Sequence, residues 1–125
     1  MFSIDIYSRV PIYIQITEGV KQAILLKLLS EGEQIQSVRE FSVSAGVNPN
    51  TVSKAYLELE RQNLLTGATG KGYFVAVGAY ERLREASLRE AKKVFLDARD
   101  RLLQHGISTE TLQHWINTNE EEAYE

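Results

Sequence analysis

The most constraining feature of this sequence is a stretch of about 25 residues, Tyr80 to Gln104, that contains neither glycine nor proline. Its apolar residues recur three or four positions apart from Leu83 to Leu102, between arginine, lysine and glutamate. This spacing predicts one amphipathic helix of roughly 37 Å at 1.5 Å per residue. An isolated helix of this hydrophobicity is not stable in water, so another surface must cover its apolar stripe.

A shorter helix is expected after Gly106, because Ser108 is a typical N-cap residue and Trp115 and Ile116 supply an apolar face. The part of the chain before residue 79 is small and offers little surface to the long helix. We therefore expect residues 79–119 to pair with a second copy in a twofold-symmetric homodimer. The candidate dimerisation residues are Leu83, Ala91, Val94, Phe95, Ala98, Leu102, Leu112, Trp115 and Ile116.

The chain has 125 residues, of which 43% are hydrophobic and 25% are charged, which indicates one folded domain, or one small domain plus an appendage. The formal net charge of −3 argues against a polycation that coats nucleic acid. This acidity lies at the end of the chain. Residues 1–78 hold seven basic and seven acidic side chains, whereas the acidic tail, residues 120–125, holds four glutamates. The charge balance therefore leaves room for a local basic face.

Several function classes are excluded by residue content. The chain has no cysteine and two histidines, so we expect no disulfide, no thiolate chemistry and no three-histidine metal centre. No serine, histidine and acid form a recognisable catalytic pattern, so we expect no enzyme, no metal site and no cofactor. No apolar run reaches the ~18 residues of a membrane span, and the N-terminus does not read as a signal peptide. We expect a cytoplasmic protein without membrane association.

The first half of the chain predicts three shorter helices. An apolar residue at every fourth position from Ile12 to Ile24 indicates the first, which begins near Pro11 and ends within residues 30–33. A capping box formed by Ser37 and Glu40 starts the second helix. The third follows a tight break.

Gly46 suits the left-handed turn position in that break, and Asn48 and Pro49 are a preferred N-cap and first helical residue. After the third helix, residues 64–77 read as strand, glycine-rich turn over 67–72, and strand. The expected fold is mainly α with a small β-hairpin. It is a winged helix-turn-helix followed by a short C-terminal helical dimerisation region.

This arrangement is suited to DNA. Small polar side chains at the N-terminal end of the third helix allow it to lie deep in the major groove. Asn50 can offer a paired donor and acceptor to adenine, and Lys54 can reach a guanine edge or a phosphate. In the hairpin turn, Gly70 and Gly72 allow close approach of the backbone, and Lys71 presents a positive charge.

Four segments resemble the DNA-binding domain of GntR-family bacterial transcription regulators. They are residues 10–16, 36–40, 46–56 and 70–75, with the sequences VPIYIQI, QSVRE, GVNPNTVSKAY and GKGYFV. The resemblance covers residues 9–77 as a DNA-binding domain. The short helical remainder is similar to the YtrA subfamily, whose members append a small two-helix dimerisation region.

The resemblance implies DNA contacts at particular positions: by Arg39 at the start of the second helix and by the polar residues of the third. The candidate DNA-binding residues are Ser37, Arg39, Asn48, Pro49, Asn50, Thr51, Ser53, Lys54, Tyr56, Gly70, Lys71 and Gly72. Tyr56 belongs to the subfamily motif, but a tyrosine beside an apolar stripe is more often a core residue, so both roles stay open.

Two departures from the family pattern bear on function. Gln36 stands where the family usually has proline before the capping serine, which removes turn rigidity but keeps the cap. Ala68 and Thr69 stand where the wing usually carries arginine, so Lys71 is the only wing charge. We therefore expect weaker phosphate binding by the wing and greater dependence on the third helix.

The leading hypothesis is a sequence-specific transcription regulator, a homodimeric repressor that binds a near-palindromic double-stranded DNA operator. The alternative is a winged helix used for protein association without specific DNA binding. The residues after the wing are too few for a large ligand-binding domain, so we expect no enclosed effector pocket in one subunit. The identity of any small-molecule effector stays unknown.

Overall fold

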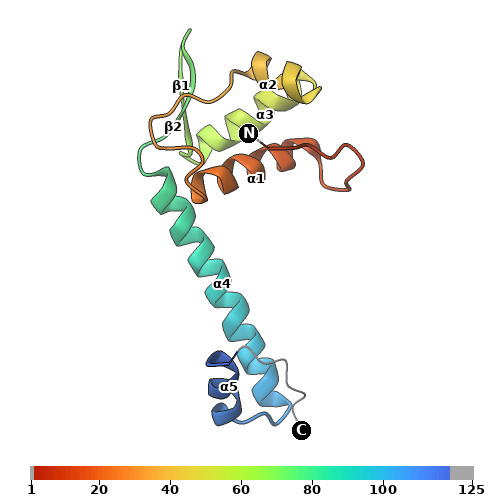
Figure 1. Ribbon diagram of the computed structural model, residues 1–125, viewed down its shortest axis with the longest axis vertical. Coiled ribbons are helices and arrows are strands. Elements are labelled where there is room, and N and C mark those ends of the chain that lie inside the picture. Colours follow the sequence, from red (N-terminus) through yellow and green to blue (C-terminus); the bar gives the residue numbers. More distant parts are fainter. Residues whose placement is uncertain (1, 119–125) are drawn as a thin grey trace. The chain divides into compact units, whose positions relative to one another are not determined.

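The computed structural model describes residues 2–118, so the predicted acidic tail lies outside this part of the chain. The elements are α1 (Ile12–Leu25), α2 (Val38–Ala45), α3 (Pro49–Arg61), β1 (Leu65–Ala68), β2 (Gly72–Val75), α4 (Ala79–Gln104) and α5 (Thr109–Ile116) (Figure 1). The chain forms two compact units, the first ending at Glu85 and the second beginning at Ala86. This boundary lies inside α4, a few residues after the one expected from composition.

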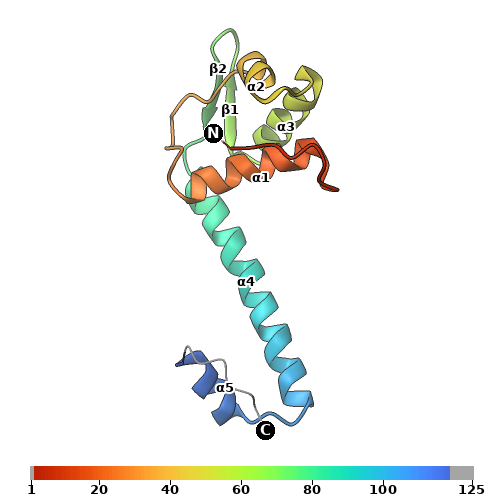
Figure 2. The same ribbon diagram turned by 45° about the vertical axis from the view of Figure 1, so that its right-hand side comes forward.

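The three helices of the first unit enclose one hydrophobic core. Its buried side chains include Ile16, Val20 and Ile24 of α1, Phe41 of α2, and Val52, Tyr56 and Leu59 of α3. They recur three or four residues apart, so the predicted apolar stripes are the faces that pack. In both ribbon views, α2, α3 and the hairpin lie on the same side of α1 (Figures 1 and 2).

Helix α1 ends at Leu25, earlier than its sequence pattern predicted. Lys27 adopts a left-handed conformation with φ of 59°, and Leu28 N–H donates to the carbonyl of Ala23 at 2.8 Å. This is a Schellman-type ending, in which two amides turn back onto carbonyls of the last helical turn. The apolar Leu28 is therefore outside the helix and exposed.

The hairpin pairs β1 with β2 in antiparallel register, with Leu65 opposite Val75 and Ala68 opposite Gly72. The strands extend further toward the tip than the sequence predicted, because residues 67 and 68 pair instead of turning. A third segment adds to this sheet: Ile35 N–H donates to Tyr73 O at 3.0 Å, and Val75 N–H donates to Glu33 O at 2.9 Å. No pattern in the sequence predicted this segment.

The first turns of α4 belong to the core of the first unit. Ala79 and Leu83 are buried in its hydrophobic cluster. The Arg82 guanidinium donates to the carbonyls of Asn63 and Val77 at 3.0 and 2.9 Å, which holds the start of α4 against the ends of α3 and β2. The prediction of Leu83 as a dimerisation residue is therefore wrong, because its side chain is already covered within its own subunit.

The second unit contains the rest of α4, a turn and α5. His105 and Gly106 follow the end of α4, and Gly106 has a φ of 85°, as expected of a glycine stop. The Ser108 hydroxyl accepts a hydrogen bond from Thr111 N–H at 3.1 Å and caps α5. The long helix, its stop and its capped successor are thus confirmed.

Candidate nucleic-acid interface

The N-terminal end of α3 is held rigid and presents polar groups outward. Asn48 is the N-cap, and its side-chain oxygen accepts a hydrogen bond from Asn50 N–H at 2.8 Å. Pro49 occupies the first helical turn, where its missing N–H removes no helical hydrogen bond. The Asn50 side chain is exposed, whereas Thr51 and Ser53 are half-buried. The polar groups at this end of α3 are therefore accessible to a ligand outside the protein.

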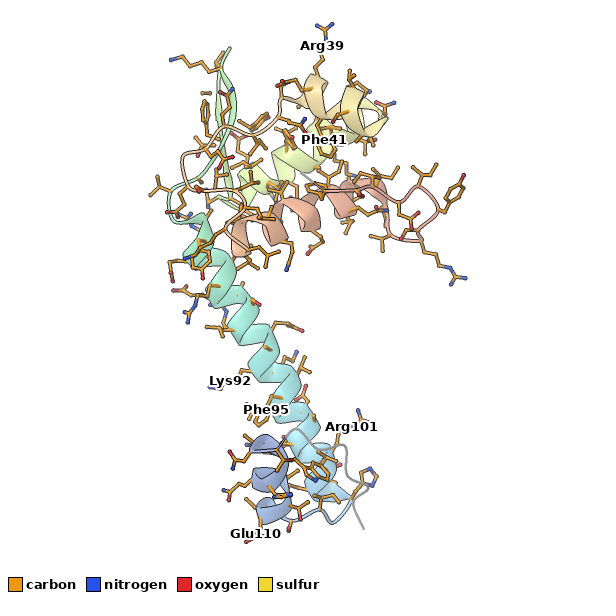
Figure 3. The ribbon with its side chains drawn as sticks, in the orientation of Figure 1. Arg39, Phe41, Lys92, Phe95, Arg101 and Glu110 are labelled. Atoms are coloured by element: carbon orange, nitrogen blue, oxygen red, sulfur yellow. The ribbon has the colours of Figure 1, made fainter. Side chains whose placement is uncertain are left out.

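Helix α2 starts with the predicted capping box. The Ser37 hydroxyl accepts from Glu40 N–H at 3.0 Å, and the Glu40 carboxylate accepts from Ser37 N–H at 3.0 Å. The backbone and side-chain hydrogen bonds from Ser37 lower the pKa of the Glu40 carboxyl group. Arg39, between them, is exposed and points away from the protein at this end of α2 (Figure 3). Its guanidinium makes no ion pair within residues 2–118.

The turn between α2 and α3 fixes the helix-turn-helix geometry. Gly46 adopts a left-handed conformation with φ of 67°, as the break in the sequence predicted. The buried Ser42 hydroxyl donates to Val47 O, and Val47 N–H donates back to Ser42 O at 3.1 Å. Ser42 was not predicted from the sequence, because a serine near a helix end is usually solvated.

The wing tip is a tight turn built on two glycines. Gly70 and Gly72 have φ values of 75° and 96°, and Lys71 N–H donates to Ala68 O at 2.9 Å. The Gln34 amide donates to Lys71 O at 2.7 Å, so the tip is tied to the segment before α2. The Lys71 side chain is exposed at this tip.

Tyr56 is a core residue. Its side chain has no solvent exposure, and its hydroxyl donates to Gln36 O at 2.8 Å. Its ring meets that of Tyr73 edge-on, with the ring centroids 5.2 Å apart. Burial raises the pKa of the Tyr56 hydroxyl, with smaller contributions from Glu40 and Tyr73. The prediction that Tyr56 contacts DNA is therefore corrected: it is enclosed between α2, α3 and the wing.

A groove of about 680 Å³ runs between α1 and the exposed side of α3. The residues that line it include Tyr13, Lys21, Asn50, Ser53, Lys54, Leu57, Glu58 and Arg61. The Lys54 ammonium lies 3.8 Å from the centre of the Tyr13 ring. No functional role of the α1 residues was predicted from the sequence, although Tyr13 lies within the family-like segment 10–16.

An ion pair lies along the same groove. The Arg61 guanidinium makes two-pronged contact with the Glu58 carboxylate, one turn earlier on α3. Hydrogen bonds from Arg61 and Gln62 lower the pKa of Glu58 to about 2, and the pair raises the pKa of Arg61. The Glu58 carboxylate is therefore ionised at neutral pH, and the adjacent Arg61 guanidinium offsets its negative charge.

Residues 12–75 match the family model described as "Bacterial regulatory proteins, gntR family". The chain belongs to the GntR family. It is a DNA-binding transcription regulator and not an enzyme, as the sequence analysis predicted. The matched residues run from the start of α1 to the end of β2, so they contain the complete helix-turn-helix and wing.

Known relatives extend this match to nearly the whole chain. It is 35% identical over 120 residues to the HTH-type transcriptional repressor YtrA of Bacillus subtilis, covering 93% of this chain and 89% of YtrA. A crystal structure of a transcriptional regulator from Oenococcus oeni superposes with a TM-score of 0.77 at 28% identity, covering 94% of this chain and 97% of that one.

A third comparison covers a smaller share of the chain. The AraR DNA-binding domain in complex with operator ORE1 is 29% identical, with a TM-score of 0.53, and covers 61% of this GntR chain and 95% of the AraR domain.

Within residues 2–118 of the GntR chain, no group of three or more histidine or acidic side chains is placed to hold a metal ion. No helix in the same range is long and apolar enough to cross a membrane.

Proposed function

We propose that this GntR protein is a homodimeric repressor that binds a near-palindromic DNA operator. The observation that supports this most directly is the capped N-terminal end of α3, which presents Asn50 from a fixed helix-turn-helix. The AraR DNA-binding domain is similar to this chain over 61% of its length and is known in complex with an operator, which supports the same use here. The similar protein YtrA is named a transcriptional repressor, which supports repression rather than activation here.

The exposed side chains divide into two roles on DNA. Asn50 and Ser53 face the major groove and read base edges, because their short polar side chains allow close approach of α3. Arg39, Lys54 and Lys71 are exposed cations that contact the operator from α2, α3 and the wing. Their charges set the salt dependence of binding.

The remaining candidate residues act on DNA through the backbone. Ser37, Asn48 and Pro49 shape the N-termini of α2 and α3, where amides are suited to phosphate. Thr51 is half-buried beside them. Gly70 and Gly72 let the wing backbone approach DNA closely, since neither position suits a side chain at positive φ.

The second unit supports dimerisation. Val94, Phe95 and Ile116 are 59%, 53% and 64% exposed, an unusual exposure for large apolar side chains. Phe95 lies beside a groove of about 390 Å³ that α4 and α5 form (Figure 3). Ala98, Leu102, Leu112, Trp115 and Ile116 also line this groove. Ala91 is exposed on the same helix, one turn before Phe95. A second copy of the same two helices would cover these groups.

A twofold dimer places two copies of α3 about 34–36 Å apart, or a multiple of this distance, on one DNA face. The operator then repeats its half-site about the symmetry axis. We propose the first unit as the DNA-binding domain and the second as the dimerisation region. Since its proposed target is bacterial chromosomal DNA, we place the protein in the cytoplasm.

A binding titration tests the proposal. The full chain is mixed with a labelled fragment from upstream of its own gene, at two salt concentrations and with excess unrelated DNA. We expect a retarded complex that survives competitor and weakens steeply with salt, and a sedimentation coefficient that fits a dimer. The arginine-poor wing and the acidic tail are the reasons to consider the alternative, a protein-association module. An intact dimer that retards no fragment at either salt concentration would establish that alternative.

A further inference from the structure

One contact in the groove between α1 and α3 joins an exposed cation of α3 to an aromatic ring of α1. The Lys54 ammonium lies 3.8 Å from the centre of the Tyr13 ring, within the range of a cation–π interaction. The Tyr13 ring itself is half-buried and packs against the hydrophobic core, so it is fixed in place. Lys54 is exposed. The contact therefore links the long, flexible side chain of Lys54 to a Tyr13 ring that the core holds in place.

The position of Lys54 on α3 explains why such support matters. Tyr13 comes from α1, so the ring draws the ammonium toward the α1 edge of the exposed face of α3. The N-terminal residues of a recognition helix meet base edges, and lysine side chains commonly bind phosphate. Lys54 lies beyond the first turn of α3, which starts at Pro49. The geometry therefore favours a phosphate as the partner of Lys54 over the guanine edge.

A competing partner lies close by. Glu58 is four residues after Lys54 on α3, at the spacing that lets a lysine and a glutamate meet on one helix face. In the structure Glu58 is bound by Arg61 and Gln62 instead. Tyr13 thus holds the Lys54 ammonium on the ring, and Arg61 occupies the carboxylate that would otherwise attract it.

From these contacts we infer that Tyr13 is a positioning residue for DNA binding, which holds the Lys54 ammonium ready for an operator phosphate and so brings α1 into recognition. This inference rests on the proposed operator binding. A free lysine loses rotamer freedom when it binds a phosphate. A lysine already held on a ring loses less of this freedom.

The test is a double-mutant cycle on operator affinity, with Tyr13→Phe, Tyr13→Leu, Lys54→Gln and Tyr13→Leu/Lys54→Gln. Tyr13→Leu removes the ring but keeps an apolar group, and we expect it to weaken binding about two- to fivefold. Tyr13→Phe keeps the ring, and we expect its affinity to stay within about twofold of wild type. In the Lys54→Gln background, Tyr13→Leu should have no further effect.

A second readout examines the contact without DNA. In the free wild-type chain and in Tyr13→Phe, the ring should shift the NMR signals of the Lys54 ε-methylene protons upfield, and in Tyr13→Leu this shift should vanish. Absence of the shift in wild type overturns the inference. The inference is also overturned if Tyr13→Leu weakens operator binding equally in the wild-type and Lys54→Gln backgrounds. It is overturned as well if Tyr13→Phe weakens operator binding as much as Tyr13→Leu does.

The two proposals fail in different ways. A wild-type chain that binds no operator overturns operator binding, and the role of Tyr13 in it, while the NMR shift still reports the ring contact. Normal wild-type binding with no coupling between Tyr13 and Lys54 overturns only the positioning role.

Discussion

The Tyr56 hydroxyl donates a 2.8 Å hydrogen bond to the carbonyl oxygen of Gln36, twenty residues earlier in the chain. This bond joins the middle of α3 to the segment that leads into α2. The Tyr73 ring packs edge-on against the same tyrosine from the wing. One buried side chain therefore ties together the three parts of the molecule that we propose to meet DNA.

Tyr56→Phe should lower the free energy of unfolding by about 1 kcal/mol, because the Gln36 carbonyl loses its donor while the ring is kept. Urea unfolding measures this change. Operator affinity, measured where the variant is fully folded, should stay within about twofold of wild type, since Tyr56 is buried. A tenfold loss of affinity in a fully folded variant would show that Tyr56 takes a direct part in binding.

Arg39→Ala should weaken operator binding and reduce the slope of log K against log salt by about 1, because it removes one of the cations that we propose to contact the operator. The thermal midpoint should hardly change, because Arg39 is exposed and makes no ion pair within the described residues. Fluorescence anisotropy with labelled operator measures the affinity. Arg84→Ala, an exposed arginine of α4, is the control and should bind like wild type. Equal affinity of both variants would remove Arg39 from the interface.

Lys71→Gln should flatten the salt dependence of operator binding by about 0.9 in the slope of log K against log salt, the contribution of one phosphate contact. The fold should be unaffected, because the Gln34 side chain binds the backbone carbonyl of Lys71 and not its ammonium. Titrations at several salt concentrations measure the slope. A slope identical to that of wild type would mean that the wing lysine does not touch DNA.

Glu58→Gln should make the protein less dependent on pH in acid. The pKa of Glu58 is lowered from 4.5 to about 2 in the folded chain, mainly by hydrogen bonds from Arg61 and Gln62. A lowered folded-state pKa stabilises the fold above the unfolded pKa, and this stabilisation is lost as the pH falls toward 2.

The stability difference between wild type and Glu58→Gln should therefore shrink between about pH 5 and pH 2. Urea midpoints across this range measure it. The effect should be small and weaker in high salt, since the pair is at the surface. A difference that stays constant with pH would contradict the lowered pKa.

Phe95→Asp should convert the proposed dimer to a monomer, because a carboxylate in the α4–α5 groove would be desolvated on association. Sedimentation at several concentrations measures the mass, and operator affinity should fall with it. Leu28→Asp is the control: Leu28 is also a large exposed apolar side chain, but it follows α1 and does not line the groove. Loss of the dimer in the control alone would place the interface elsewhere.

The local features of the chain were predictable because each depends on a few neighbouring residues. Ser37 and Glu40 specify a capping box within four positions, and the structure contains it. Asn48 and Pro49 specify the start of α3 in the same way. The apolar spacing of Tyr80–Gln104 predicted a helix that the structure shows as Ala79–Gln104.

Long-range contacts were not predictable from such patterns. Leu83 fits the stripe of the long helix, but burial in the first unit decides its role. The third segment of the wing sheet has no periodicity of its own, since Ile35 joins it through backbone atoms. The pairing of Lys54 with Tyr13 joins two helices that are far apart in sequence.

The amino-acid sequence by itself determined the helices, their caps, the glycine turns and the family of this protein, because hydrogen bonds between near neighbours and apolar periodicity are local properties. Only the tertiary structure decided that Tyr56 is enclosed and that Lys54 lies on a ring of α1. The physical reason is that burial and side-chain contact depend on which distant segments pack together, and that packing is a property of the whole fold.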